Sequence, residues 1–295
     1  MNDVHAIRPD SHAGKTLRST ARLILTNARI AIEGRTQPDA NSIHDFRRCT
    51  KRWRAFLVLI DPLIGTDTKS LKADARNMAH TLGSARDAQS ALDAIADLSE
   101  HGLALSDRSK ESIRARIDAI RHAAETTTLT DDTRKRLAQT LDRSIAAVEH
   151  WPLGSVAFTD IAERLAAGYR AARRAIPEIW SEADGEALHE LRKRVIRHRY
   201  QMEMVVPFWK NFGRMWIEEA QRLRTSLGKH QDLLVLAGLT APHQPLAAWR
   251  AKLLPAIAQR RAHHVRVANR MATRLLVDKP KAFRRRIEAI WKTDT

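Results

Sequence analysis

The segment HDFRRCTKRWR (residues 44–54) returns 145 residues later as HELRKRVIRHR (residues 189–199). Two further landmarks keep the same offset, because Leu82-Gly83 with Asp87 returns as Leu227-Gly228 with Asp232. A chance match between basic stretches is common in a chain with 51 Lys and Arg residues, whereas a shared register across unlike motifs is not. We infer that the 295 residues are a duplication of one unit.

The composition favours helices in both copies. Only 11 Gly and 10 Pro residues interrupt the chain, aromatic residues make up 5 %, and hydrophobic residues reach 43 %. Such a chain is poor in sheet formers and has enough apolar residues for a sizeable core. We expect an all-α protein of two antiparallel helical bundles. The first copy should form helices over residues 15–34, 39–60, 70–98, 107–125 and 130–151, with a candidate break at Gly83. The second copy begins near Phe158, with breaks expected around Pro207, Pro242 and Pro255.

The helix expected over residues 39–60 separates its cations from its apolar side chains. At about 100° per residue, one face carries His44, Arg47, Arg48, Lys51, Arg52 and Arg54. The opposite face carries Phe46, Thr50, Trp53, Leu57 and Ile60. The second copy repeats the basic face with His189, Arg192, Lys193, Arg197 and Arg199, while Ile196 stands where the first copy has Lys51.

Few acidic residues dilute these two basic faces. Like charges at helical spacing repel one another, and the nearby Asp45 and Glu190 lie in the first helical turn, where the helix dipole favours an anion. A solvated basic face is the simpler explanation for one copy, but two copies in register favour a face that an anionic ligand neutralises. Asp39 or Ser42, and Asp184, are candidate N-caps of the two helices.

The formal net charge of +17 makes a polyanion the first candidate partner. The single cysteine, Cys49, excludes a disulfide framework and a cysteine-based zinc site. Residues 1–14 have no apolar core typical of a secretory signal, and we expect them to be loosely ordered. The longest stretch without formal charge, Leu233 to Trp249, is interrupted by prolines, so we expect a cytoplasmic protein with no membrane partner.

His44 and His189 occupy the same place in the two basic faces. A neutral imidazole can donate one hydrogen bond to a phosphate, and a neighbouring polyanion would favour the protonated form. His44 has no second ligand at metal-binding spacing on its own face, and we expect neither a metal nor another cofactor.

Several further residues are secondary candidates. Asp87 and Asp232 either pair with an arginine of a basic helix and fix its position, or cap a helix. Additional phosphate contacts are expected from Arg22, Arg29, Arg86, Arg170, Arg174 and Lys229. The clusters Arg260-Arg261 and Arg284-Arg285-Arg286 are interpreted as solvated faces, and Trp53, Trp209, Trp216 and Trp291 as core residues.

The ordered set of motifs resembles the CHAD family, the conserved-histidine α-helical domain. The resemblance rests on His44 to Arg54 with Leu82-Gly83 and Asp87, and on His189 to Arg199 with Leu227-Gly228 and Asp232. It implies two four-helix bundles, residues 15–151 and 152–295, related by a pseudo-twofold axis around a basic channel that binds inorganic polyphosphate. It also implies a domain without enzymatic activity, in some members associated with polyphosphate granules. Two departures are Ile196 in place of a cation and Gln231 in place of the arginine before the aspartate.

Three functions remain open. The first is binding of polyphosphate, or of other phosphate and sulfate anions, between one wall of His44, Arg47, Arg48, Lys51 and Arg52 and another of His189, Arg192, Lys193 and Arg197. The second is nucleic-acid binding, which is less favoured because proteins that bind single strands usually add stacking aromatics. The third and least favoured is phosphoryl transfer through the repeated histidines.

Overall fold

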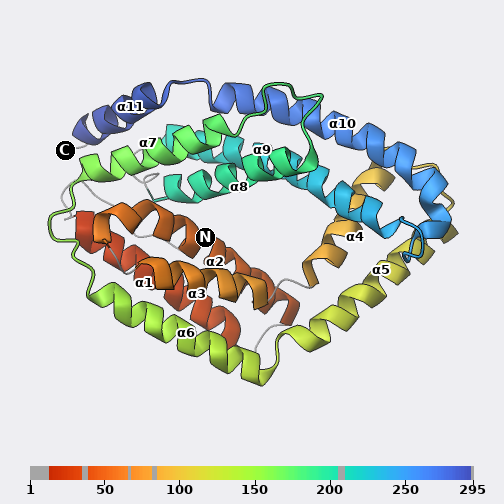
Figure 1. Cartoon of the computed structure of the whole chain (residues 1–295), viewed down its shortest axis with the longest axis horizontal. Helices are drawn as coiled ribbons and strands as arrows, with labels where there is room; N and C mark the ends of the chain where they lie inside the picture. The colour runs from red at the N-terminus through yellow and green to blue at the C-terminus, as the bar shows by residue number, and fades with distance from the viewer. Residues whose placement is uncertain (1–12, 35–38, 66–67, 82–84, 205–209, 294–295) are drawn as a thin grey trace.

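The computed structural model describes residues 13–34, 39–65, 68–81, 85–204 and 210–293. Over these residues the backbone forms eleven α-helices and one short 3₁₀ turn, Ala247–Trp249, and no β-strand (Figure 1). The helices are α1 (Ala13–Glu33), α2 (Asp39–Ile64), α3 (Thr68–Thr81), α4 (Ala85–Glu100), α5 (Asp107–Thr128), α6 (Asp131–Glu149), α7 (Phe158–Arg174), α8 (Gly185–Met202), α9 (Lys210–Leu239), α10 (Arg250–Leu275) and α11 (Pro280–Thr293). The all-α prediction is confirmed. No helix in the described part of the chain has an apolar stretch long enough to cross a membrane.

The helix bounds follow the offset between the sequence copies. The starts of α7, α8 and α10 lie within two residues of the positions that match the starts of α1, α2 and α5. The third predicted helix is divided into α3 and α4, whereas the single helix α9 spans most of the matching positions of the second half. The candidate break at Gly83 lies outside the described residues. A pseudo-twofold axis between the halves stays a prediction.

One predicted break is wrong. Pro255 lies inside α10, close to the beginning of that helix. A proline in the helix interior removes one backbone hydrogen bond, and the buried side chains of Leu253 and Ile257 on either side hold this turn against the core. Pro242 lies in the connection between α9 and α10, as expected, and Pro207 lies outside the described residues.

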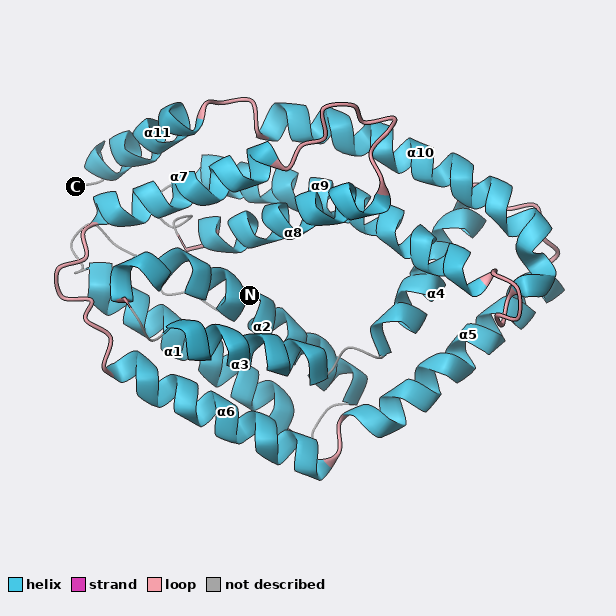
Figure 2. Ribbon diagram, in the orientation of Figure 1, coloured by secondary structure: helices cyan, strands magenta, loops and turns pink. Residues whose placement is uncertain are grey.

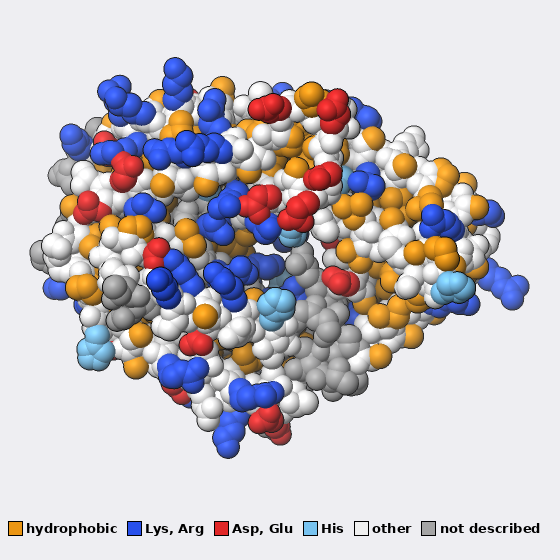
Figure 3. All heavy atoms as spheres, in the orientation of Figure 1, with side chains coloured by type: hydrophobic (Ala, Val, Ile, Leu, Met, Phe, Trp, Pro, Cys, Tyr) orange, Lys and Arg blue, Asp and Glu red, His pale blue; other side chains and the backbone are white. Residues whose placement is uncertain are grey.

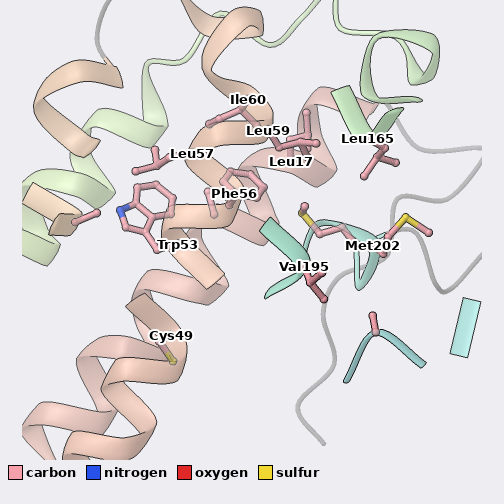
Figure 4. Close-up of a cluster of buried hydrophobic side chains, with 14 of the residues drawn as sticks. Leu17, Cys49, Trp53, Phe56, Leu57, Leu59, Ile60, Leu165, Val195 and Met202 are labelled. Atoms are coloured by element: carbon pink, nitrogen blue, oxygen red, sulfur yellow. The ribbon is translucent and has the colours of Figure 1, made fainter. Parts of the chain in front are cut away.

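The main core lies beneath the two basic helices and joins the two halves. The apolar face of α2 is buried as predicted, and Trp53 stacks against Trp151 with ring centroids 6.0 Å apart. Leu165 from α7 and Val195 from α8 belong to the same core (Figure 4). Burial of the apolar stripe fixes the rotation of α2 about its axis, and the basic face therefore points away from the core.

The predicted core tryptophans largely lie where expected. Trp53 and Trp216 are buried, and Trp291 is half-buried and stacks on Phe158 with centroids 3.9 Å apart. Trp209 lies outside the described residues.

A second, smaller core does not follow the boundary between the sequence copies. It is formed by α4 and α5 of the first half together with the C-terminal part of α9 and the N-terminal part of α10. These four segments lie toward one end of the molecule, away from α1 and α11 (Figure 2). Each core thus draws on both halves, so the two copies pack together and share two cores.

The start of the second basic helix is fixed by its predicted cap. Asp184 Oδ1 accepts a hydrogen bond from the backbone N–H of Ala187 at 2.7 Å, which satisfies one of the free N–H groups of the first turn of α8. In the first basic helix, Ser42 lies inside α2, so it is not the N-cap, and the side chain of Asp39 lies outside the described residues.

Candidate anion-binding groove

The two basic helices meet at one groove. A cavity of about 600 Å³ lies between α2, α8, α4 and the middle of α9. Its cationic lining comes from both copies: Arg47, Arg48 and Lys51 on α2, Arg192 and Arg199 on α8, and Arg224 on α9. His44 and the predicted Asp232 also line it. We call this cavity the central groove; Figure 3 shows Lys and Arg side chains gathered beside a hollow at the centre of the molecule.

A second cavity extends the basic surface along α2. This α2–α3 cavity of about 400 Å³ is lined by Arg47, Thr50, Lys51, Arg54, Arg76, Ala79, His80 and Asp87. It shares Arg47 and Lys51 with the central groove, so the same two cations face both spaces. Arg76 and His80 are one helical turn apart on α3, and the sequence analysis did not identify them. The sequence pattern could have indicated them, because Leu71, Ala75 and Met78 form the buried face of α3, and Arg76 and His80 lie off that face.

Matched positions of the two copies line the two cavities. Arg47, Arg54, Arg76, Ala79 and Asp87 line the α2–α3 cavity. Their counterparts in the duplicated sequence, Arg192, Arg199, Gln221, Arg224 and Asp232, line the central groove. The helix that follows each basic helix contributes one cation to this lining. In the first copy the cation is Arg76, whose counterpart is Gln221. In the second copy it is Arg224, whose counterpart is Ala79.

Like charges crowd together where the basic helices approach. Partial burial lowers the pKa of the Arg197 guanidinium, and repulsion from Arg194 and Arg54 lowers it further. The pKa of Arg54 is also lowered, by the packing around its side chain and by the nearby Arg76. Among the described residues, no carboxylate forms an ion pair with Arg54 or Arg197. An anion bound here would relieve a repulsion already present in the fold.

Gly228 explains the second Leu-Gly motif. Leu227 is buried, and a Cβ atom added to Gly228 would lie 3.3 Å from Nη2 of Arg192. Any larger residue at this position would therefore press on a guanidinium that is itself almost fully buried against α9. The glycine thus makes room for an arginine of the basic helix. The matching Leu82-Gly83 lies outside the described residues.

Several predicted cations are held by acidic residues away from the groove. Lys193 pairs with Glu190 at 2.8 Å and with Glu186 at 3.6 Å. On α1, Arg22 pairs with Glu149, and Arg29 pairs with Asp142 and Glu33.

Other predicted residues lie outside the lining of both cavities. Arg170 and Arg174 are exposed on α7, and His189 is half-buried on α8. Arg52 is withdrawn from the groove by Glu203, with Nη2 and Oε2 3.0 Å apart. The side chain of Arg86 lies outside the described residues.

Lys229 belongs to a buried ion cluster that sequence reasoning missed. Asp97 on α4 accepts hydrogen bonds from Lys229 Nζ at 2.7 Å, Arg260 Nε at 2.6 Å and Arg260 Nη2 at 3.0 Å, and its Oδ2 lies 2.9 Å from His264 Nε2. Burial alone would raise the pKa of Asp97, but the hydrogen bonds from Arg260, Lys229 and His264 outweigh it and hold the pKa far below its ordinary value. The cluster ties α4 of the first half to α9 and α10 of the second.

Arg284 and Arg286 are engaged with acids on the surface, in keeping with their interpretation as a solvated face, whereas that interpretation is wrong for Arg260, which is only 12 % exposed. Arg284 pairs with Glu163 and Glu288, and Arg286 pairs with Asp278. For a metal ion, the group with suitably placed ligand atoms in the described chain is Asp97, Glu100 and His101. The Asp97 carboxylate is already shared by Lys229, Arg260 and His264, which leaves it little capacity for a metal.

Comparison with known proteins agrees with the motifs. The family model for the CHAD domain matches residues 16–241. The fold is similar to that of PptA from Streptomyces chartreusis, with a TM-score of 0.68 and 18 % identity over 91 % of this chain and 100 % of that one. It is also similar to the CHAD domain from the plant Ricinus communis, with a TM-score of 0.58 and 18 % identity over 92 % of this chain and 94 % of that one. A search of curated proteins gives no match. The family match covers well over half of the sequence, and the chain belongs to the CHAD domain family.

Proposed function

We propose that this protein binds inorganic polyphosphate, without chemical turnover, in the central groove and the α2–α3 cavity. The observation that carries the proposal is the convergence of Arg47, Lys51 and Arg192, from two helices about 145 residues apart in sequence, on one groove. A CHAD domain is expected to bind this polymer, and the position of the cations supports that expectation here.

The lining suits a linear chain of phosphates. Arginine forks bind phosphate oxygens through two parallel hydrogen bonds, while lysine acts as a point charge. Arg47 and Lys51 face both cavities, so a chain lying across them keeps cationic contacts on either side. We propose that the chain runs from the central groove past these two residues to Arg54, Arg76 and His80.

The same lining disfavours the alternative functions. Proteins that bind single-stranded nucleic acid stack bases on aromatic rings, but the one aromatic residue lining the central groove in the described chain, Tyr200, is covered by Arg199, 4.4 Å from its centroid. Phosphoryl transfer would require a reactive group and acidic residues gathered around the phosphates. The carboxylates lining the described cavities, Asp87, Asp93 and Asp232, are interspersed with more numerous cations.

The test is a comparison of matched double variants. Arg47→Ala with Arg192→Ala removes one groove arginine from each copy, and Arg270→Ala with Arg274→Ala removes two exposed arginines of α10 that lie outside both cavities. Losing two charge-assisted contacts of about 1.5–3 kcal/mol each should weaken polyphosphate binding by more than 100-fold. The α10 pair should weaken it by less than about threefold. Equal losses would show that the ligand responds only to net charge.

Calorimetric titration at about 150 mM salt, with single-stranded DNA of similar charge as a competitor, completes the test. We expect the long-chain polyphosphate to bind more tightly than the DNA. Equal affinity for both ligands would favour the nucleic-acid function, and release of orthophosphate during the titration would favour the enzyme.

A further inference from the structure

One acidic residue joins the two basic helices. Glu203 directly follows α8, and its carboxylate is shared by two arginines of the predicted basic faces. Oε2 accepts from Arg52 Nε at 3.2 Å and Nη2 at 3.0 Å, and Oε1 accepts from Arg199 Nη1 at 2.7 Å. One arginine comes from α2 and the other from α8, so this carboxylate bridges the two copies.

The bridge lies at one end of the central groove. Arg199 and Tyr200 line the groove, whereas Arg52, Tyr200 and Glu203 line a separate, mostly apolar cavity of about 20 Å³. Tyr200 therefore borders both spaces, whereas Glu203 lines only the smaller one. A cavity of that size holds about one water molecule, so it has no room for a phosphate chain.

The carboxylate occupies the position of a ligand. Two guanidinium groups that converge on two oxygens, above one aromatic ring, form the kind of clamp that binds a phosphate group. The side chain of Glu203 is 16 % exposed and that of Arg199 is 14 % exposed, so the pair is only weakly screened by salt. The positive charges of Arg52 and Arg199 are in this way largely satisfied within the protein.

We propose that Glu203 is a specificity-determining residue: an internal anion that fills a phosphate-type subsite between Arg52 and Arg199 and ends the polyphosphate path at this point. The proposal rests on the function proposed above. If so, the polyphosphate chain leaves the central groove through the α2–α3 cavity. The cations of the predicted basic faces then fall into two groups: those that contact the ligand, and those that pair with Glu203.

The direct test is Glu203→Gln, which keeps the shape of the side chain and removes its charge. Two guanidinium groups then lose their counter-ion at the end of the groove. Since each phosphate neutralised releases about 0.7–0.9 of a counter-ion, the slope of log K against log salt should steepen by about 1–2. Polyphosphate affinity at low salt should rise by roughly tenfold.

The matched control is Glu190→Gln. Glu190 is also an acidic residue of the second basic helix, but it pairs with Lys193 and Arg194 and lies outside both cavities. Glu190→Gln changes the net charge by the same one unit as Glu203→Gln. We expect it to change the slope of log K against log salt by less than about 0.5. An equal gain in both variants would overturn the inference, because the effect would then be one of net charge.

A role in positioning alone gives the opposite result. If Glu203 only holds Arg199 in place for the ligand, Glu203→Gln should weaken binding and leave the salt slope unchanged or shallower. A second measurement covers the case in which that variant does not fold. Arg52→Gln should lose less than a third of the binding free energy lost by Arg47→Gln, and an equal loss would contradict the inference. Failure of the unmodified protein to bind polyphosphate would instead count against the proposed function.

Discussion

The buried cluster around Asp97 leads to the most direct test of how the two halves are held together. The side chain of Asp97 is 3 % exposed, that of His264 is 5 % exposed and that of Arg260 is 12 % exposed. Asp97→Ala removes the carboxylate that accepts hydrogen bonds from His264, Arg260 and Lys229. The Arg260 guanidinium and the His264 ring are then left without this partner and with little access to water.

The expected cost follows from that burial. Removal of one partner from a buried ion pair typically costs about 3–5 kcal/mol, because the remaining charge is left uncompensated. Lys229 can turn toward solvent since it is 40 % exposed, which places the expected loss nearer to the lower figure. We therefore expect Asp97→Ala to lower the free energy of unfolding by about 3–4 kcal/mol at pH 7.

Urea unfolding followed by circular dichroism at 222 nm measures this loss. Glu100→Ala is the control, because it removes an exposed acid from the same helix, and it should cost less than about 0.5 kcal/mol. A loss of less than about 1 kcal/mol for Asp97→Ala would refute the reasoning, since the cluster would then behave like a surface pair.

The pH dependence gives a second check on the same residue. Because the folded pKa of Asp97 lies below its ordinary value of 3.8, the carboxylate stabilises the fold fully above that value and less as the pH falls below it. The difference between the unmodified protein and Asp97→Ala should therefore shrink below pH 4. A difference that grows below pH 4 would contradict the assignment.

Three further predictions concern other parts of the molecule. Burial lowers the pKa of His198 to about 3, and burial with repulsion from nearby Arg261 lowers that of His230 to about 4. Each histidine takes up a proton near pH 6.5 when the chain is unfolded. The free energy of unfolding should therefore be highest above that pH and fall by about 1.4 kcal/mol per pH unit for each histidine between pH 6 and pH 5. Urea unfolding at pH 7 and pH 5 checks this, and equal stabilities would argue against it. Gly228→Ala should displace the Arg192 guanidinium by a few tenths of an ångström and weaken polyphosphate binding about three- to tenfold, with thermal unfolding shifted by only a few degrees; unchanged affinity would show that Arg192 does not contact the ligand. Arg76→Ala should weaken binding of long polyphosphate by about tenfold and that of short oligophosphates much less, as measured by competition titration, and a loss independent of chain length would exclude the proposed path through the α2–α3 cavity.

The sequence was most informative where local periodicity decides the structure. The apolar face of residues 39–60 determines which side of α2 is buried, and Phe46, Trp53, Leu57 and Ile60 lie in the core as predicted. The Asp184 cap is also a local feature, and it was predicted correctly. A helical period depends only on the residue's own helix, so these features need no knowledge of the partner helices.

Tertiary neighbours account for what the sequence did not predict. A helical wheel places Arg52 and Arg47 on one face, but the wheel does not contain Glu203, which draws Arg52 away from the groove. Arg76 lines the α2–α3 cavity only because α3 folds back along α2. The division of the core was missed for the same reason, since α4 packs on α9 of the other half as well as on α5 of its own copy.

The burial of Asp97 could not be predicted from composition or local sequence. Asp97 is one of 34 acidic residues in a basic chain, and nothing in its local sequence separates it from Asp93, which lies one turn earlier and is exposed. Only the approach of α9 and α10 brings Lys229, Arg260 and His264 to its carboxylate. A buried charge can be identified once its partners are known, and they come from 132 to 167 residues away in sequence.

We propose that the groove between α2 and α8 holds the phosphate chain. A crystal structure of the full chain with polyphosphate of defined length would show the position of the ligand. We predict continuous phosphate density that contacts Arg47, Lys51 and Arg192 and stops short of Glu203. Phosphate density confined to the outer face near Arg284 and Arg286, with the groove between α2 and α8 unchanged, would contradict this assignment.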